Sequence, residues 1–357
     1  MTGRSFRPLA VLDRIEETPD AVSLVLERPP DFGYKAGQHL PIRLYLGGRE
    51  ERRTYTLSSS PLEEHLRITV KRVQGGLVSN LLNDLVRVGD RVEARAPIGS
   101  FFLDCHPSNY RSIYLFAAGS GITPMISILK TVLATESNSS TYLLYGNRDE
   151  DRVIFKDELE ELLARHPDRF KLAHALSRTR GCSQAWWSPR TPWDSRPGIV
   201  DRESVRWFLN RHHPKAQDAY YFICGPAGMN ESVRAALREI DVPEEDIYVE
   251  HFRAPEERVP TEVLLVDAVA DIRQGEKSFK LSVPKGKTVL QTLLDAGHDP
   301  PYSCRSGICG SCRARIVRGE VQMRSAAALS NRDLKRGLVL ACQARCTTAE
   351  VALDFGS

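Results

Sequence analysis

The sequence predicts three domains: an antiparallel β-barrel, a doubly wound parallel α/β domain and a small α+β domain at the C-terminus. A chain of 357 residues is too long for one ordinary hydrophobic core. Near Ser112 the pattern changes from short alternating apolar runs to strands that alternate with helices. The expected boundaries are residues 1–107 for the barrel, 108–252 for the α/β domain, 253–261 for a linker and 262–357 for the last domain.

Short apolar runs separated by glycine and proline turns are typical of an antiparallel barrel. The segment Arg53–Thr56 ends one of its strands, and apolar residues at helical spacing predict a helix over residues 79–86. The other strands are expected at residues 21–26, 39–44, 66–70 and 91–95.

In the middle domain, apolar runs alternate with helical segments, which indicates a parallel sheet. The first run is followed by a glycine-rich turn and a helix that continues through Leu133. The segment from Cys182 to Arg196 contains Trp186 and Trp187 but no regular period, so we expect a long surface loop whose role is open. The strands are expected at residues 113–118, 141–145, 171–176 and 219–224, and the domain ends near residues 248–252.

Residues 253–261 are charged, contain two prolines and have no periodicity, so they indicate a linker. A helix is expected after them over residues 289–296, and Leu338–Ala341 is expected to be a buried strand. The other strands of the last domain are expected at residues 263–266, 278–283, 313–317 and 351–355.

Composition excludes several classes of protein. A net charge of +3 gives no reason to expect a nucleic-acid partner. No stretch approaches the ~20 apolar residues that span a bilayer, and residues 1–10 show no secretory signal. The cysteines outside the motif described next lack the spacing of a disulfide framework, so we expect a reducing compartment, the cytoplasm. We also expect the protein to be a monomer.

Four cysteines carry the strongest signal in the chain. Cys304, Cys309 and Cys312 follow C-x4-C-x2-C spacing and Cys342 lies thirty positions beyond, the pattern of a plant-type [2Fe–2S] cluster. Gly307 and Gly310 lie between the ligands, where the backbone must curl around the cluster and aim N–H groups at its sulfurs. Tetrahedral zinc and four structural cysteines are the alternatives. Cys346 is a possible decoy ligand, but we favour Cys342 because a buried strand delivers it.

Two motifs of the barrel could hold a phosphorylated, flat-ringed cofactor. In Arg53-Thr54-Tyr55-Thr56 an arginine can grip a phosphate, an aromatic can cover a ring and a hydroxyl can bond the ring edge. Taken alone, this string is usually an ordinary exposed strand end. Gly75 and the run Gly76-Leu77-Val78-Ser79 lead into the expected helix, and free N–H groups there form a pyrophosphate site. The alternative is that Ser79 merely caps the helix.

Two further motifs lie at strand ends of the α/β domain. Gly119, Gly121 and Thr123 stand between a buried strand and a helix, as in dinucleotide sites, although Pro124 replaces the third glycine of the usual fingerprint. Cys224 and Gly225 also follow a strand and open a helix. Two such loops would flank the crevice where ligands bind. Alternatively, Cys224 is a plain buried cysteine.

These motifs, in this order ahead of the cysteines, resemble the ferredoxin–NADP reductase superfamily, in the branch with a C-terminal plant-type ferredoxin domain. The resemblance extends over nearly all of residues 8–356. It is strongest to the reductase components of bacterial oxygenases, such as those serving phenylacetyl-CoA epoxidase and ketosteroid 9α-hydroxylase. It implies that the last domain has a β-grasp fold and that the barrel binds a flavin.

The resemblance also implies a role for each motif. Arg53 would contact a flavin phosphate, Tyr55 would pack on the isoalloxazine and Thr56 would hydrogen-bond near N5. Gly76, Leu77, Val78 and Ser79 would cradle the pyrophosphate of FAD, with FMN as the alternative. Gly119, Gly121, Thr123 and Gly225 would line the nicotinamide dinucleotide site, Cys224 would lie beside the nicotinamide, and Phe252 would cover the other flavin face.

Electrons would pass from a nicotinamide through FAD to the cluster, because a flavin exchanges electrons both in pairs and singly. NADPH is favoured over NADH, because Ser177 and Arg178 end the third strand where relatives place contacts to the 2′-phosphate, with Arg148 nearby. The expected acceptor is a separate oxygenase, hydroxylase or desaturase. A non-oxygenase acceptor such as a hybrid-cluster protein is the second hypothesis, and a redox-responsive binding module that does not turn over is the third.

Overall fold

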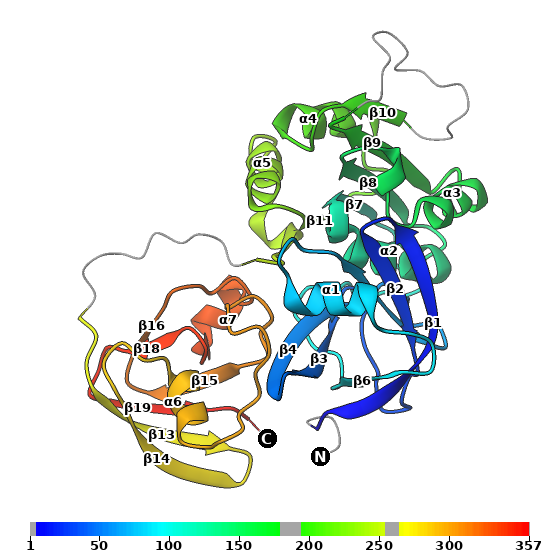
Figure 1. Ribbon diagram of the computed structural model, residues 1–357. Coiled ribbons are helices and arrows are strands. Elements are labelled where there is room, and N and C mark those ends of the chain that lie inside the picture. Colours follow the sequence, from blue (N-terminus) through cyan, green and yellow to red (C-terminus); the bar gives the residue numbers. More distant parts are fainter. Residues whose placement is uncertain (1–4, 179–193, 254–263, 357) are drawn as a thin grey trace. The chain divides into compact units, whose positions relative to one another are not determined.

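The computed structural model describes residues 5–178, 194–253 and 264–356 (Figure 1). These residues form two compact units. The first covers most of residues 5–252, and the second covers residues 264–356 together with residues 52–54 and 98–100. The first unit contains two sheets, and the second contains one main sheet and a short two-stranded one. Within the described residues, no helix is long and apolar enough to cross a membrane.

The first sheet is antiparallel and nearly closed, as the sequence predicts. Its strands follow the order β4-β3-β6-β1-β2-β5. Closure comes from residues just after β4, because Leu57 bridges Ile68 and the N–H of Ser58 donates to the carbonyl of Arg67 at 2.7 Å. The strands are β1 (Arg7–Thr18), β2 (Ala21–Leu26), β3 (His39–Leu46), β4 (Arg49–Thr56), β5 (Leu66–Lys71) and β6 (Arg91–Ala94).

Helix α1 (Leu77–Asp84) lies against β5, where the Asn83 amide donates to the carbonyl of Val70 at 3.1 Å. It begins two residues earlier than expected. Gly76 is the residue that precedes its first turn, so the alternative interpretation of Ser79 as the helix cap is wrong.

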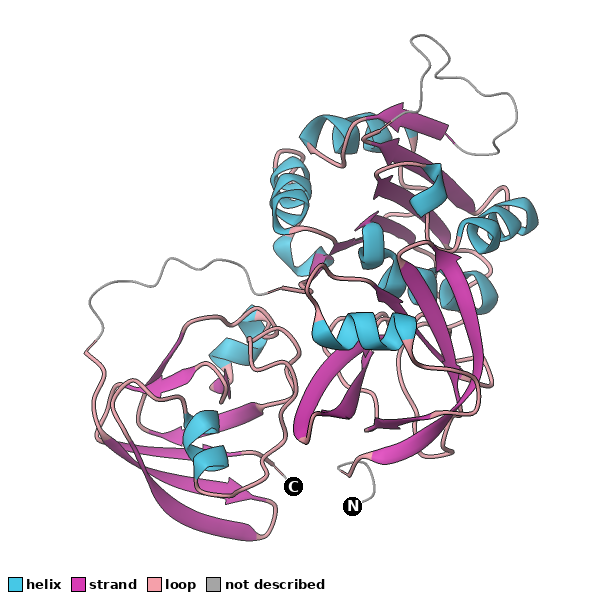
Figure 2. Cartoon of the chain, viewed as in Figure 1, coloured by secondary structure: helices cyan, strands magenta, loops and turns pink. Residues whose placement is uncertain are grey.

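The second sheet is parallel, in the order β10-β9-β8-β7-β11-β12. Alternate residues of β7 face opposite cores: Leu115 packs with helices α2 and α3, whereas Phe116 packs with α4 and α5. Figure 2 shows helices on both faces of this sheet, which is the predicted doubly wound arrangement. The strands are β7 (Ser112–Ala118), β8 (Ser140–Asn147), β9 (Phe170–Leu176), β10 (Asp194–Pro197), β11 (Ala219–Cys224) and β12 (Ile247–Glu250). The helices are η1 (Gly119–Gly121), α2 (Ile122–Thr135), η2 (Glu150–Arg152), α3 (Lys156–Arg165), α4 (Arg202–Arg211), α5 (Ala227–Arg238) and η3 (Glu244–Asp246).

Strand β10 corrects the expected surface loop. The end of that segment, from Asp194, pairs in parallel with β9 at the edge of the sheet. The register joins Asp194 to Ala173 and Arg196 to Ala175. Trp186, Trp187 and the rest of residues 179–193 lie outside the described residues, so the expected loop there stays a prediction.

The second unit is built on a mixed sheet in the order β14-β13-β19-β15-β17, in which β13 and β19 are parallel. The expected strand at residues 263–266 is wrong in its described part. Residues 264–266 lie outside any strand, and Leu264 is 74% exposed, whereas Ala268, Ala270 and Ile272 of β13 are buried. The elements are β13 (Ala268–Gln274), β14 (Lys277–Val283), α6 (Val289–Asp295), β15 (Arg313–Arg318), β16 (Val321–Met323), α7 (Asn331–Lys335), β17 (Leu338–Leu340), β18 (Ala344–Cys346) and β19 (Glu350–Asp354).

Candidate functional site

The carboxyl edge of the parallel sheet gathers the predicted nucleotide residues. Strand order reverses between β7 and β11, since β8 and β9 extend to one side of β7 while β11 and β12 extend to the other. Such a reversal is the point where open α/β sheets bind ligands. The loops that follow β7 and β11 carry the two predicted glycine motifs, and the register pairs Ala117 with Cys224 directly before them.

These two loops touch each other through Gly121. A Cβ added at Gly121 would overlap the carbonyl oxygen of Cys224 and lie 2.6 Å from its carbonyl carbon. Gly119 has φ +53, and the Tyr145 hydroxyl donates to its carbonyl at 3.0 Å. The glycines therefore let two strand-end loops meet at the switch point.

The first helical turn of α2 is open to an anion. No side chain caps this end, and its first turn contains no acidic residue. The Thr123 hydroxyl donates to the carbonyl of Ser120 at 3.0 Å, and Thr123 is only 2% exposed. Thr123 therefore shapes the loop from inside, and the backbone N–H groups are what the loop offers a phosphate.

Cys224 is completely buried beside this loop. Burial raises the pKa of its thiol well above the usual value, and the charge of Glu250 on the neighbouring strand raises it further. A thiol that is held neutral in this way does not act as a nucleophile at neutral pH. Gly225 is also confined, because an added Cβ would lie 2.5 Å from the sulfur of Met229.

Ser177 and Arg178 continue the same edge. Both are exposed, and the N–H groups of Ser177 and Arg178 donate to the carbonyls of Asn147 at 3.0 Å and Arg148 at 2.6 Å. The structure therefore places Arg148 and Arg178 side by side at the ends of β8 and β9. Phe252 follows β12 at this edge and is 39% exposed.

Lys71 is a candidate that the sequence did not reveal. It ends β5, and its ammonium nitrogen lies 3.7 Å from the position of a Cβ at Gly119. Burial lowers its pKa while Asp20 opposes that shift, and Arg148 contributes a further lowering. In the sequence, Lys71 ends a strand just ahead of the Gly75-Gly76 turn, and this position is the only local signal. Its proximity to Gly119 is a tertiary contact, which the sequence does not reveal.

The predicted flavin residues divide between β4 and the start of α1. Arg53 and Tyr55 share one face of β4 because side chains alternate along a strand, whereas Thr56 alternates to the other face and is 5% exposed. A Cβ at Gly76 would lie 2.5 Å from the Ser79 hydroxyl and 2.9 Å from Cβ of Val73. The first turn of α1 has no side-chain cap and no acidic residue, so its N–H groups suit a pyrophosphate.

The two sheets of the first unit are joined by buried polar contacts. The Ser127 hydroxyl of α2 donates to the carbonyl of Ser59 at 2.6 Å, and Ser60 and Thr131 share a hydrogen bond of 2.8 Å. Arg67 of β5 pairs with Glu158 of α3 at 2.7 Å. These contacts fix the glycine loop before α1 relative to the switch point.

In the second unit, four cysteines lie as two adjacent pairs. The thiol of Cys309 hydrogen-bonds to Cys304 and lowers the pKa of Cys304 to about 5, assisted by Ser306 and by the backbone N–H of Ile308. Cys312 lowers the pKa of Cys342 in the same way. Among the described residues, no group of three or more metal-binding side chains converges on one point. Two adjacent pairs of thiolates fit two irons, each of which takes two of the sulfurs.

The backbone of the cysteine loop curls as expected. Gly307 has φ +81 and Gly310 has φ +67, and a Cβ at Gly307 would lie 2.9 Å from Cγ of Gln343. The Gln343 amide reaches the sulfur of Cys342 at 3.5 Å. Cys346 lies in the same hydrophobic core as Cys312 and Cys342, but burial alone raises the pKa of its thiol, with no contribution from another cysteine.

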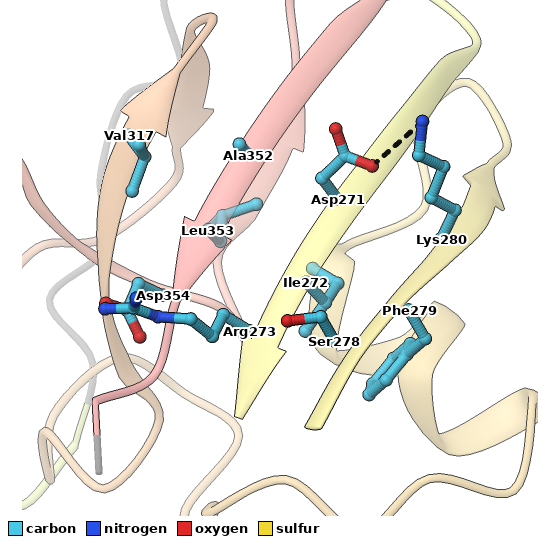
Figure 3. Close-up of a pocket in the computed structure, with 10 residues that line it drawn as sticks. All are labelled: Asp271, Ile272, Arg273, Ser278, Phe279, Lys280, Val317, Ala352, Leu353 and Asp354. Carbon is cyan, nitrogen blue, oxygen red and sulfur yellow. Dashed lines mark hydrogen bonds and ion pairs between the residues drawn. The ribbon is translucent and has the colours of Figure 1, made fainter. Parts of the chain in front are cut away.

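A hollow of about 430 Å³ lies elsewhere, over the sheet of the second unit (Figure 3). Its charged residues pair with one another, as in the 3.5 Å contact of Lys280 with Asp271 and the ion pair of Arg273 with Asp354. None of the predicted cofactor residues lines it.

Comparison with known proteins identifies the three domains. The oxidoreductase FAD-binding domain family matches residues 9–103, the oxidoreductase NAD-binding domain family matches residues 115–235, and the 2Fe-2S iron-sulfur cluster binding domain family matches residues 272–347. The cofactors are therefore FAD, a pyridine nucleotide and a [2Fe–2S] cluster.

Relatives extend over the whole chain. One component of the 1,2-phenylacetyl-CoA epoxidase from Escherichia coli is 31% identical and aligns over 98% of both chains. The ferredoxin reductase component of 3-ketosteroid-9-alpha-monooxygenase from Mycobacterium tuberculosis is 34% identical over 97% of this chain and 95% of its own. The solved structure of phthalate dioxygenase reductase, at 26% identity, covers 98% of both chains with a TM-score of 0.59.

Proposed function

This chain belongs to the family of oxygenase reductase components that join FAD-binding, NAD-binding and [2Fe–2S] domains, and we propose that it delivers electrons from NADPH to a separate oxygenase, hydroxylase or desaturase. The observation that carries this proposal is the contact of Gly121 with Cys224 at the switch point. We infer that this contact brings together the two loops of a dinucleotide site, in the same unit as the glycine loop that precedes α1.

The side chains position the reactants and keep water out. When bound, FAD would supply the coupling between two-electron hydride transfer and one-electron transfer to the cluster. We place the nicotinamide beside the loop that follows Cys224 on the strength of its position in the family motif, while the helix starts at Gly76 and Gly121 and the ammonium of Lys71 offer charge to phosphates. We assign Tyr55, Thr56 and Phe252 to the flavin on the strength of their positions in the family motif.

The visible spectrum of the purified protein tests this function. Flavin and cluster bands that NADPH bleaches within seconds, without air, would support a reductase. Bands that persist while nucleotide binds would favour the redox-responsive binding module. Pairing the reduced protein with oxygenases encoded beside its gene would then identify the acceptor, and failure with all of them would favour a non-oxygenase acceptor such as a hybrid-cluster protein.

We also propose that the protein works in the cytoplasm. Four cluster ligands and the buried Cys224 require a reducing environment, and all seven cysteines among the described residues are unbridged.

Replacing Arg178 by alanine is expected to raise the KM for NADPH about tenfold or more. The 2′-phosphate of NADPH carries nearly two negative charges, and a lost charged hydrogen bond costs about 1.5–3 kcal/mol. The KM for NADH should barely change, because NADH lacks that phosphate. Steady-state kinetics with both nucleotides provides the measurement.

Two variants control for this result. Lys71→Met should weaken both nucleotides equally, since Lys71 lies at Gly119, on the loop shared by both. Arg165→Ala, at an exposed site on α3, should affect neither. A wild-type preference for NADH, or equal effects of Arg178→Ala on both nucleotides, would remove the assignment of NADPH.

Replacing Gly76 by alanine is expected to lower the fraction of protein that retains FAD. The backbone at Gly76 has φ −76, which alanine adopts freely, so the effect comes from the overlap of Cβ with Ser79 and Val73. Flavin released by heat and separated by chromatography gives both its amount and its identity. Gly33→Ala, where an added Cβ meets nothing within 4 Å, is the matched control. Full occupancy in Gly76→Ala would contradict a pyrophosphate site there, and release of FMN would contradict the assignment of FAD.

A further inference from the structure

The part of the second unit that holds the cysteines is strongly basic. Residues 302–347 contain nine arginines and lysines but only two carboxylates, Glu320 and Asp333. The rest of the unit has no such excess. The nine cations are Arg305, Arg313, Arg315, Arg318, Arg324, Arg332, Lys335, Arg336 and Arg345.

Two of these arginines adjoin the cysteine loop directly. Arg305 follows Cys304, is exposed, and adopts φ +57, a conformation that is uncommon for a residue with a side chain. The Gln343 amide fixes this turn by donating to the carbonyl of Arg305 at 3.0 Å. The guanidinium of Arg313 lies 3.6 Å from the position of a Cβ at Gly310.

Two more arginines belong to the small sheet formed by β16 and β18 or adjoin it. This sheet is antiparallel and pairs Arg345 with Gln322 and Ala344 with Met323, so Arg324, which follows Met323, lies diagonally across from Arg345, near enough for its charge to lower the pKa of Arg345. Ser325, next to Arg324, packs on the cysteine loop, because its Cβ lies 3.1 Å from the position of a Cβ at Gly307. We call Arg305, Arg313, Arg324 and Arg345 the cluster rim.

The charges of the cluster rim are poorly neutralised by the protein itself. Among the described residues, Arg313 alone in the rim has a carboxylate within 4 Å, namely Asp333 at 3.9 Å. Nε of Arg345 is buried and has no hydrogen-bond partner. Burial, followed by the charge of Arg324, lowers the pKa of Arg345. Gathering like charges costs free energy. The cluster with its four thiolates would be anionic and would offset part of that cost, and an anionic partner would offset the rest.

The hollow in Figure 3 shows the contrast within the same unit. There Lys280 pairs with Asp271 at 3.5 Å, and Arg273 forms an ion pair with Asp354. Charges on that face of the sheet satisfy one another, so it does not select a partner by charge.

We propose that the electron acceptor docks on the cluster rim through an acidic surface of its own. This inference rests on the proposed function, because docking beside the cysteine loop matters only if the cluster is the exit for electrons. Complementary charge would steer the acceptor to the loop and speed its association, and salt would weaken that effect. Within the loop, Arg305 is the contact nearest to the cluster ligands.

The test compares two haem proteins of opposite charge, acidic cytochrome b5 and basic cytochrome c, as electron acceptors. The variant carries Arg305→Glu and Arg324→Glu, both at exposed positions. At low ionic strength it should reduce cytochrome b5 about tenfold more slowly than wild type, and cytochrome c faster. Raising the ionic strength should slow the wild type with cytochrome b5 but not the variant. Lys277→Glu with Lys280→Glu, both at exposed positions, makes an equal change of charge on the other part of the unit and should leave both rates unchanged.

Two readouts separate this proposal from its rivals. The first readout is the anaerobic bleaching of flavin and cluster by NADPH, which should be the same in the variant and the wild type. If the wild type itself does not bleach, the proposed function is wrong. Slower cluster reduction in the variant, with unchanged rates to both haem proteins, would mean that the rim faces the flavin-binding unit and would overturn the proposal. If the variant reduces both haem proteins more slowly than the wild type does, the substitutions have shifted the reduction potential of the cluster. That result would also overturn the docking proposal.

Discussion

Replacing any one of the four cluster cysteines by serine is expected to remove the visible bands of the [2Fe–2S] cluster and to reduce electron delivery to a protein acceptor to background. The four positions are Cys304, Cys309, Cys312 and Cys342. Each replacement removes one thiolate from a set of two pairs, and a hydroxyl is a poor ligand for iron in a sulfide-bridged cluster. Reduction of the flavin by NADPH should survive, because the nucleotide site lies in the other unit. Iron and sulfide analysis, the visible spectrum and anaerobic flavin bleaching are the measurements.

Cys346→Ser supplies the matched control. Cys346 is only four residues from Cys342 and is buried in the same hydrophobic core, but its thiol interacts with no other cysteine among the described residues. The variant should keep its cluster and lose some stability, because a hydroxyl replaces a buried thiol. Iron lost from Cys346→Ser and retained in Cys342→Ser would reverse the ligand assignment.

Sequence reasoning succeeded where the decisive residues are local. The cysteine spacing and the glycines at 307 and 310 lie on one loop, and the structure shows the positive φ angles that such a turn needs. The strand-end glycine motifs were likewise visible, because a strand, a glycine turn and a helix follow one another in the chain.

Sequence reasoning failed where the alternation of apolar residues is hidden. Strand β1 buries Leu9 and Val11 but continues through Asp13, Arg14 and Glu16, so it resembles an exposed loop. The buried face of strand β13 includes two small alanines, so it gives a weak apolar signal. The more apolar residues 263–266, just before it, were therefore predicted to be the strand. Strand β10 exists only through pairing with β9, which propensity does not report.

The parts of the site that could not be predicted are contacts between distant segments. Lys71 approaches Gly119 only because the barrel and the parallel sheet are held together by Arg67, Glu158 and the buried hydroxyls around Ser127. Nothing in the spacing of these residues along the chain reveals that proximity. The contact between Gly121 and Cys224 is of the same kind, and it has the largest expected consequence for the chemistry.

Gly121→Ala is expected to slow flavin reduction by NADPH about a hundredfold. The backbone at Gly121 has φ −61 and ψ −9, which alanine adopts without strain, so the whole effect comes from the new methyl group. That methyl would overlap the carbonyl oxygen of Cys224 and push the two loops of the switch point apart. A displacement of about 1 Å at reacting atoms costs about a hundredfold in rate, and overpacking costs about 1–3 kcal/mol of stability.

Gly228→Ala is the control, since it lies in the helix that follows the same loop and an added Cβ meets nothing within 4 Å. It should preserve the rate and slightly raise Tm, because alanine is the better helix former. Rapid mixing without air measures the rate, and thermal unfolding measures the stability of both variants. Because Gly121 and the cysteine loop belong to different units, the cluster spectrum of Gly121→Ala should be unchanged once dithionite reduces it. A wild-type rate in Gly121→Ala would mean that the nicotinamide does not bind between these two loops, and the assignment of the switch point as the hydride-transfer site would fall.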